Sequence, residues 1–485
     1  MNHLPLRYLL GLSIIILSSS GAAAQIQPLA PMPAQPPRSA PLSVPPGTFL
    51  GGVPSGELTT TVAKLTVVSA MARALEHNLG VLNAQHNVDR AEGARWRSLS
   101  ELLPNVNGRI SETRQIINLA AFGFGGANTP FPDLPTLVGP FNVFDARISL
   151  SQSVLDFGAL YGARAEAHSV EAARLTFKSA REYVINVAGT LFVQALAASA
   201  RADAARAQES TARTLHQQAI DLKEGGLIAG IDVLRADVQL STQTQRTTIA
   251  VNEFEKAKLQ LARAIGLPLG QPFELDPALP NLPPADISLD TAVALAYQTR
   301  ADYKAALERV SAAEATRQSI VGDALPSVKV DANYGAIGLS PADARTTYAV
   351  AGAVNVPIFQ GGRTHGRLLE ADADIRGRRT EAEDLKAAIY YEVRGAFLDL
   401  DATARQLALA GKTRDLANQQ LTQARDRFAA GVANNVEVVQ AQDAVAIADE
   451  QFIAAQYGYD LARGALLRGT GQSEDLLRQL LGGPR

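Results

Sequence analysis

The fold of this chain is decided by one stretch of sequence that occurs twice. Residues 65–106 read LTVVSAMARALEHNLGVLNAQHNVDRAEGARWRSLSELLPNV, and residues 287–328 read ISLDTAVALAYQTRADYKAALERVSAAEATRQSIVGDALPSV. The two stretches align without a gap, and both end in Leu-Pro followed by a polar residue and valine. Together with matches further along, the repeat extends over about 200 residues, far more than the roughly 20–50 residues of a solenoid unit. The sequence therefore predicts a duplicated molecule with two quasi-equivalent halves.

The correspondence resumes downstream and predicts the same order of elements in each half. Val154–Gly158 matches Ile358–Gly362, and Gly226–Ala236 matches Gly431–Ala441. Each half is expected to contain a continuous helix (about 66–101 and 288–323), two strands, a long helix, a sharp turn and a partner helix. The predicted segments are a first repeat over 58–267 with strands within about 105–155, a Pro-rich connector over 268–286, a second repeat over 287–470 with strands within about 327–357, and a C-terminal tail over 471–485.

The amino-acid composition indicates a folded chain and argues against several classes of function. The 485 residues are 47% hydrophobic and 19% charged, which is typical of a folded rather than a disordered protein. The net charge of −3 provides no electrostatic attraction for nucleic acid. Because the sequence has no cysteine, disulfides, thiol catalysis, cysteine metal sites and the lipid-modified cysteine of a lipoprotein are excluded.

The N-terminus has the pattern of a cleaved secretory signal peptide over residues 1–24. Arg7 is followed by an apolar run at 9–17 and by three alanines at 22–24. The apolar run is too short for a transmembrane helix, which needs about 20 residues. Residues 25–57 are rich in proline, which favours an extended or disordered tether. No later segment is expected to be apolar enough for a transmembrane helix, so the exported chain is predicted to cross a membrane only as β-strands.

After each Leu-Pro the hydrophobic period changes to two, which predicts strands with one apolar and one polar face. Lys329, Asp331 and Asn333 alternate with apolar residues in the second half, as Asp145 and Arg147 do in the first. With the apolar face in lipid, these five side chains would face the lumen of an outer-membrane β-barrel. Four strands cannot close such a barrel, because the smallest single-chain examples have about 8 and an open edge in lipid leaves backbone groups unpaired. The barrel must therefore be shared between chains.

Very long helices are predicted over about 158–224 and 363–429, each about 100 Å long at roughly 1.5 Å per residue. Their partner helices, over about 231–265 and 436–468, carry small and apolar residues in a seven-residue repeat, which is typical of paired coiled-coil helices. A coiled-coil surface adhesin or scaffold without a pore would explain these heptads. It would not explain strand pairs with one exposed apolar face, which favour the barrel.

These motifs, in this order and duplicated, resemble the TolC family of outer-membrane efflux and secretion ducts. The resemblance rests on both Leu-Pro junctions, on the strand exit Pro357–Arg363 and on the turns at Gly226–Ala236 and Gly431–Ala441. It covers about residues 58–470 and implies a mainly α-helical chain with a small β part. In the homotrimer that it implies, twelve strands form a barrel in outer-membrane lipid and the long helices form a tunnel through the periplasm.

The resemblance also implies a function and partners. The duct would passively pass small molecules expelled by an inner-membrane transporter, to which a periplasmic adaptor (a membrane fusion protein) connects it. A type I protein-secretion exit duct is an alternative with the same physics. No cofactor, metal site or nucleic-acid partner is predicted, and no nucleophile–base signature or phosphate-binding glycine loop indicates an enzyme.

The turns between long and partner helices are the candidate periplasmic gate. By resemblance, Asp232 and Glu437 line the closed entrance, where threefold symmetry would gather their carboxylates into cation-attracting rings. The alternative is that each acid only interacts favourably with the dipole of its own helix. Phe428 is a candidate aromatic plug, and Arg235 is expected to pair with Asp232 within one helix. The glycines expected to supply the left-handed backbone of the two reversals are Gly225, Gly226, Gly230 and Gly431.

Overall fold

The structure of the chain, a computed structural model, describes residues 48–122, 135–280, 288–430, 432 and 435–482. The chain divides into two compact units, Met1–Pro45 and Pro46–Arg485, and every described residue belongs to the second. The predicted signal peptide and most of the predicted tether therefore lie outside the described residues. The second unit is mostly helical, with one four-stranded sheet and one two-stranded sheet among its described residues.

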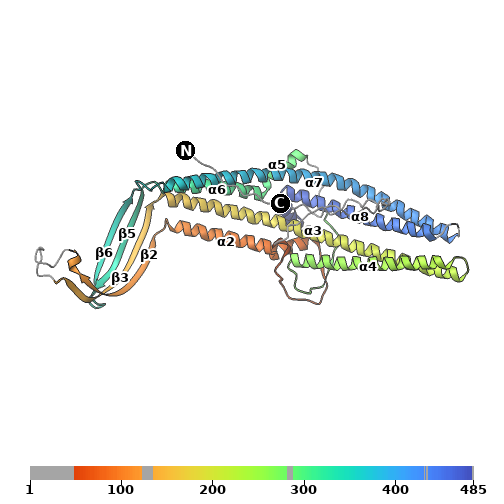
Figure 1. Cartoon of the computed structure of the whole chain (residues 1–485), viewed down its shortest axis with the longest axis horizontal. Helices are drawn as coiled ribbons and strands as arrows, with labels where there is room; N and C mark the ends of the chain where they lie inside the picture. The colour runs from red at the N-terminus through yellow and green to blue at the C-terminus, as the bar shows by residue number, and fades with distance from the viewer. Residues whose placement is uncertain (1–47, 123–134, 281–287, 431, 433–434, 483–485) are drawn as a thin grey trace, which may run out of the picture. The chain divides into compact units, whose positions relative to one another are not determined.

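Long helices dominate the second unit and are paired as hairpins (Figure 1). α3 (Phe157–Glu224) and α7 (Arg363–Ala429) contain 68 and 67 residues. Each is therefore about 100 Å long at roughly 1.5 Å per residue. They reverse into the partner helices α4 (Gly230–Ala264) and α8 (Asn435–Gly469), against which they pack. These hairpins confirm the predicted duplication and the predicted long helices.

The seam between α7 and α8 confirms the predicted seven-residue repeat. It is a core of small and branched apolar side chains, which let the two helices approach closely. On α8 the buried positions are spaced three and four residues apart. The buried residues of this seam are Ala417, Leu421, Ala424, Val438, Ala441, Val445 and Ala448.

The four predicted strands form one antiparallel sheet in the order β2 (Asn105–Asn118), β3 (Leu137–Leu155), β5 (Ser327–Gly338) and β6 (Arg345–Asn355). The β3–β5 pair joins the two halves of the duplication. Figure 1 shows the sheet at one end of the long helices and the two hairpin turns at the other. Among the described strands β2 and β6 each have a single neighbour, so both edges of the sheet present unpaired backbone groups.

The first helix of each half is broken, whereas the sequence predicted one continuous helix. Asn78 separates α1 (Val67–His77) from α2 (Leu79–Ser100), and Arg300 separates α5 (Leu289–Thr299) from α6 (Ala301–Gly322). Both residues have extended backbone, with ψ of 131° at Asn78 and 121° at Arg300. They are equivalent in the repeat, and each side chain holds other elements of the fold. Hydrophobic periodicity alone does not reveal such a break.

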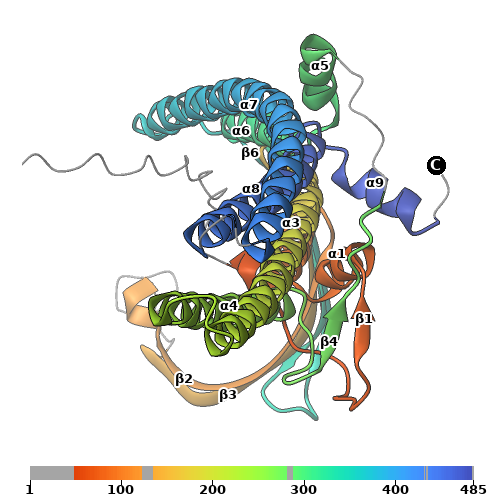
Figure 2. The same ribbon diagram turned by 90° about the vertical axis from the view of Figure 1, so that its right-hand side faces the viewer.

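The predicted connector and tail contain packed elements. β4 (Phe273–Leu275), within the connector, pairs in parallel with β1 (Ala63–Leu65). α9 (Ser473–Leu480) occupies the predicted tail, and its Leu477 is buried. Figure 2 shows the short elements α1, α5, α9, β1 and β4 gathered on one side of the long helices. The tail is therefore part of the packed unit, because α9 packs against α3, α1 and α8.

The last residues of the predicted tether also pack against the helices. The short helix η1 (Thr48–Leu50) places Phe49 edge-on to Tyr183, with ring centroids 4.8 Å apart. The Val53 amide donates to the His77 carbonyl at 2.8 Å, and Nη2 of Arg73 donates to the Ser55 carbonyl at 2.6 Å. The tether prediction is therefore wrong for residues 48–57, where prolines thin out and apolar side chains find partners.

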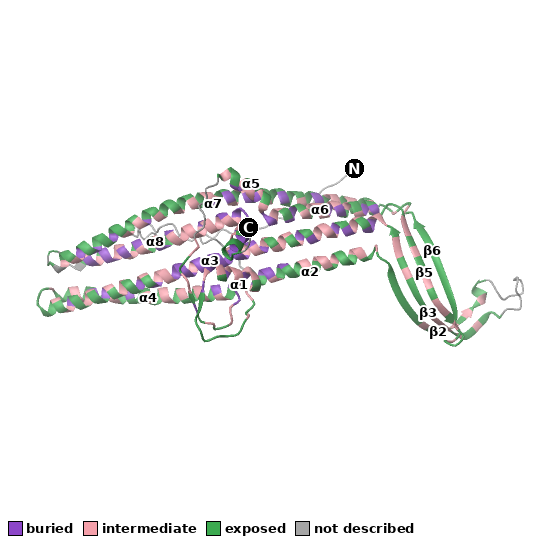
Figure 3. Cartoon of the chain, turned by 180° about the vertical axis from the view of Figure 1, so that it is seen from behind, coloured by how far each residue is buried: buried purple, intermediate pink, exposed green. Residues whose placement is uncertain are grey.

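The middle of α3 corrects the expectation that no later segment is apolar enough for a transmembrane helix. α3 contains an 18-residue window with a mean hydropathy of 1.5, enough by length and composition to cross a membrane. Of this window, 72% is buried inside the unit (Figure 3), and α1, α6, α8 and α9 are among the helices that contact α3. A helix that is covered on all sides is apolar all round, so core packing accounts for this window.

Candidate functional site

The register of the four-stranded sheet places the predicted polar side chains on one face. Residues that lie directly opposite each other in antiparallel strands share a face. Asp145 lies two residues before Arg147 and therefore shares its face. The pairs on this polar face include Arg147–Gly335, Ser149–Asn333, Ser151–Asp331 and Ser153–Lys329. All five side chains predicted to face a lumen thus share one face of the sheet, and the lumen itself stays a prediction at this point.

Two further basic residues on the polar face were not predicted from the sequence. Arg109 of β2 lies directly opposite Arg147, and Arg345 of β6 lies opposite Ile337, which in turn lies opposite Asp145. The alternation that reveals Arg109 is present in the sequence, where polar residues occupy 105, 107, 109, 111 and 113. Arg345 is the first residue of its strand, so alternation alone places it less clearly.

The opposite face of the sheet is apolar and open over most of its length, and the charged residues Glu112 and Arg114 of β2 lie on it further from the helices. Ile148, Tyr334 and Tyr348 lie side by side on neighbouring strands, and they are 57%, 63% and 78% exposed. Large apolar side chains continue this face on all four strands. A soluble chain rarely exposes a contiguous apolar patch of this kind, which is typical of a surface that meets lipid or another protein.

The hairpin turns at the far ends of the long helices share one type of backbone hydrogen bond. The amide of Leu227 donates to the carbonyl of Leu222 at 2.9 Å, and the amide of Val432 donates to the carbonyl of Arg427 at 2.9 Å. In the first turn the residue before the donor, Gly226, has left-handed backbone, with φ of +73°. Gly225 and Gly230 do not have positive φ, which corrects the prediction for them, and Gly431 lies outside the described residues.

Each predicted gate acid lies next to an arginine of its own hairpin. Asp232, in the first turn of α4, accepts from Nη1 of Arg235 at 3.1 Å, as predicted for this pair. Glu437, in the first turn of α8, lies 3.3 Å from Nε of Arg427 at the end of α7. The arginines offset the charge of both acids locally, so cation attraction at these tips is weaker than two bare carboxylates would give.

Phe428 lies in the last turn of α7 and packs against the α7–α8 seam, half-buried. Its ring therefore already has a packing role within one hairpin. The prediction that it also plugs an entrance is not tested by this arrangement. Apolar side chains that are more exposed than Phe428 lie at the turns themselves, among them Leu227 at 74% and Val432 at 71%.

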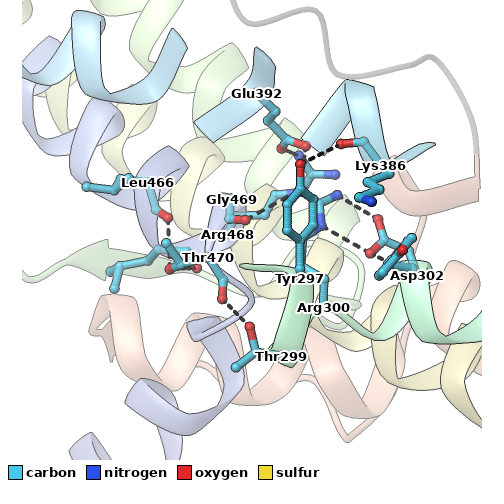
Figure 4. A network of polar contacts seen from close by, with 12 residues as sticks. Tyr297, Thr299, Arg300, Asp302, Lys386, Glu392, Leu466, Arg468, Gly469 and Thr470 are labelled. Atoms are coloured by element: carbon cyan, nitrogen blue, oxygen red, sulfur yellow. Dashed lines mark hydrogen bonds and ion pairs between the residues drawn. The ribbon is translucent and has the colours of Figure 1, made fainter. Parts of the chain in front are cut away.

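A buried polar network that the sequence did not indicate surrounds Arg300 at the α5–α6 break (Figure 4). The Arg300 side chain is 6% exposed, and its guanidinium binds Asp302 through Nη2 at 2.6 Å and Glu392 of α7 through Nη1 at 2.6 Å. Glu392 also pairs with Arg468 near the end of α8. Beside it, the Thr299 hydroxyl donates to the Thr470 carbonyl at 2.6 Å. The network therefore connects α5, α6, α7 and the end of α8.

The first half makes the corresponding contact with an uncharged residue. Nδ2 of Asn78 donates to the Ala264 carbonyl at 3.1 Å, as Nη1 of Arg300 donates to the Gly469 carbonyl at 3.5 Å. Ala264 and Gly469 each end the partner helix of their half. In both halves the residue at the helix break thus binds the carbonyl at the end of the partner helix by a hydrogen bond. In the second half the same residue also forms ion pairs.

Burial and charge shift several ionisation equilibria in this region. Burial by itself raises the pKa of Asp302, but the hydrogen bond and charge of Arg300 outweigh it and hold that pKa below its ordinary value. Burial raises the pKa of the Glu182 carboxyl of α3 to about 7, although Lys178 opposes the shift. Among the described residues, no three His, Asp or Glu side chains converge in a way that could hold a metal ion.

The chain is similar to proteins of known class. A family model described as outer membrane efflux protein matches residues 70–267 and 292–472. The alkaline protease secretion protein AprF of Pseudomonas aeruginosa is 22% identical over 334 residues, which cover 66% of this chain and 68% of that protein. The outer membrane channel CmeC of Campylobacter jejuni has a TM-score of 0.74 at 17% identity, covering 90% of this chain and 94% of that one. VceC of Vibrio cholerae, an outer membrane protein, has a TM-score of 0.71 at 16% identity, covering 84% and 96%.

Proposed function

The chain belongs to the outer membrane efflux protein family, and we propose that it is the trimeric exit duct through which a tripartite system expels small molecules. The observation that carries the trimer is the open four-stranded sheet. Its outer strands β2 and β6 each lack a second neighbour among the described strands. In lipid such edges are too costly, because each unpaired backbone group costs several kcal/mol. Three copies placed edge to edge would satisfy both edges with a twelve-stranded barrel.

The two faces of the sheet support the same proposal. Lipid would meet the apolar face that includes Ile148 and Tyr334, and water would fill the space against the face that includes Arg147 and Asp331. The helices α3 and α7 would continue the lumen for about 100 Å, at roughly 1.5 Å per residue, into the periplasm. The predicted signal peptide over 1–24 accords with export to this location, and the sequence lacks a cysteine for a lipid anchor.

The partners follow from the position of such a duct. A pore held open by packing and hydrogen bonds is passive, so an inner-membrane transporter would supply the energy and a periplasmic adaptor would join it to the hairpin turns. We assign the protein no enzymatic step and no cofactor. Exposed Leu227 and Val432 lie at the turns, where an adaptor would dock.

Protein secretion is a second candidate function, favoured by the similarity to AprF, a protein named for alkaline protease secretion.

A strain with the gene deleted distinguishes small-molecule efflux from protein secretion. Loss of the gene should raise the cellular accumulation of a fluorescent efflux dye, and the wild-type gene should restore extrusion. Loss of a secreted protein from the medium with unchanged dye accumulation would favour the secretion duct. No change in either measurement would contradict both.

The gate acids provide a prediction for the closed entrance. Replacing Asp232 and Glu437 together with alanine should raise single-channel conductance and weaken block by multivalent cations, because the carboxylates that would bind cations and hold the entrance closed are lost in every chain. Planar-bilayer recording measures both. The matched control replaces Asp221 and Asp426, exposed acids on the other side of the same two turns. Wild-type conductance and block in the first variant would mean that the two acids only begin their helices.

A further inference from the structure

The strand register arranges the charged side chains of the polar face in rows across the sheet. One row contains Arg109 of β2 and Arg147 of β3 directly opposite each other, followed by Gly335 and Thr347. The adjacent row, further from the helices, contains Ser111, Asp145, Ile337 and Arg345. These two rows therefore bring three arginines together with a single acid.

The polar face as a whole is basic. Its charged residues in the described strands are four bases and two acids, which leaves a net charge of +2 on each chain. The opposite charges of Lys329 and Asp331, two residues apart near the helices, cancel in this sum. The excess therefore lies in the two arginine rows. The six charged residues are Arg109, Asp145, Arg147, Lys329, Asp331 and Arg345.

The contacts within these rows leave most of the positive charge uncompensated. Like charges directly opposite each other on neighbouring strands are unfavourable. Asp145 forms its ion pair with Arg147, whose Nε lies 2.6 Å from its Oδ1, and its charge acts more weakly on Arg109. Among the residues that the structure describes, neither Arg109 nor Arg345 forms an ion pair within 4.0 Å. Two guanidinium groups in each chain thus stay available to a passing solute.

The backbone beside Arg147 leaves room for its side chain. A Cβ atom added at Gly335 would lie 2.5 Å from Cγ of Arg147 and 2.1 Å from the carbonyl oxygen of Ala146. Any larger residue at this position would displace the arginine or the strand. In this row Arg109 faces Arg147, and Gly335 leaves the space in which the Arg147 side chain lies across the neighbouring strand.

We propose that Arg109, Arg147 and Arg345 form an arginine belt inside the strand barrel that favours the exit of anionic small molecules. The proposal rests on the duct function and names the substrate class at its outer end. In a closed trimer, three copies of the two rows would encircle the lumen. A ring of like charge in a pore with low-dielectric walls focuses its field on the aqueous path and raises the local concentration of counter-ions.

The test is ion selectivity in a planar bilayer under a KCl gradient. All channels carry Asp232→Ala and Glu437→Ala, so that the acids at the turns do not set the reversal potential. The test variant adds Arg109→Gln and Arg345→Gln, the two arginines without an ion pair. The control adds Arg114→Gln instead, because Arg114 is on β2 but on the opposite face. Trimer formation is checked for every variant.

The parent channel should pass chloride more readily than potassium. The Arg109→Gln/Arg345→Gln channel should show a severalfold lower chloride-to-potassium permeability ratio, and the Arg114→Gln channel should match the parent. An unchanged ratio in the test variant, or an equal fall in the control, would overturn the arginine belt while leaving the duct in place. Folded trimers that conduct no ions in any variant would overturn the duct function, and the belt with it.

Discussion

Replacing Ile148 with arginine should abolish trimer assembly in the outer membrane, whereas the same change at the neighbouring residue Ser149 should be tolerated. Ile148 is 57% exposed on the apolar face, beside Tyr334. An arginine on the lipid face of a barrel costs roughly 2–4 kcal/mol near the bilayer midplane. Every chain of a trimer carries this cost, so the sum is comparable with the whole stability of a typical domain of about 5–15 kcal/mol.

Ser149 is the matched control because it follows Ile148 on the same strand and points to the other face, opposite Asn107 and Asn333. The measurement is the amount of trimer in isolated outer membranes, resolved by size after mild detergent extraction. Equal loss of trimer in Ile148→Arg and Ser149→Arg would show that the assignment of the two faces to lipid and lumen is wrong.

Replacing Arg300 with alanine should destabilise the helical part by about 3–5 kcal/mol, the usual cost of removing one partner from a buried ion pair. The substitution leaves the carboxylates of Asp302 and Glu392 without their buried cation. Urea unfolding followed by helical circular dichroism measures the loss. Arg405→Ala is the control, since its pair with Asp401 is 76% and 66% exposed and should contribute no more than about 1 kcal/mol.

The pH dependence of this loss has a defined sign. In the wild type the pKa of Asp302 lies below its ordinary value of 3.8, so its ion pair stabilises the fold above that pH and is lost as the pH falls through the folded value. Without Arg300, burial is the largest remaining influence, so the pKa of Asp302 should rise. The stability difference between wild type and Arg300→Ala should therefore be largest at neutral pH and shrink toward pH 4. A difference independent of pH would mean that lost packing, rather than charge, causes the effect.

The fold could be predicted because its elements are long and periodic. The 68-residue α3 and the buried seam at Val438, Ala441 and Val445 follow directly from helical and seven-residue spacing. The faces of β3 and β5 follow from alternation, because a residue in a strand has only two sides to occupy. Arg109 obeys the same rule, so a reading of β2 residue by residue would have found it.

The remaining features depend on contacts between distant segments. The breaks at Asn78 and Arg300 are stabilised by carbonyls more than 160 residues away in sequence, which no local pattern reveals. The two strand exits also differ. Gly361 and Gly362 adopt φ of +60° and +82° before α7, whereas the Asp156 side chain caps α3 by accepting from the Ala159 amide at 2.9 Å. Either solution starts a helix, so the sequence indicates the junction but not its geometry.

The central claim, that three copies close one barrel around a lumen, is tested most directly by a single preparation. The molar mass of the detergent-purified protein is measured by light scattering, and the same fraction is reconstituted into a planar bilayer for single-channel recording. We expect the mass of a trimer and discrete, long-lived conductance steps. A stable monomer that shows no conductance would contradict the claim, because a lone sheet with the open edges of β2 and β6 cannot persist in lipid.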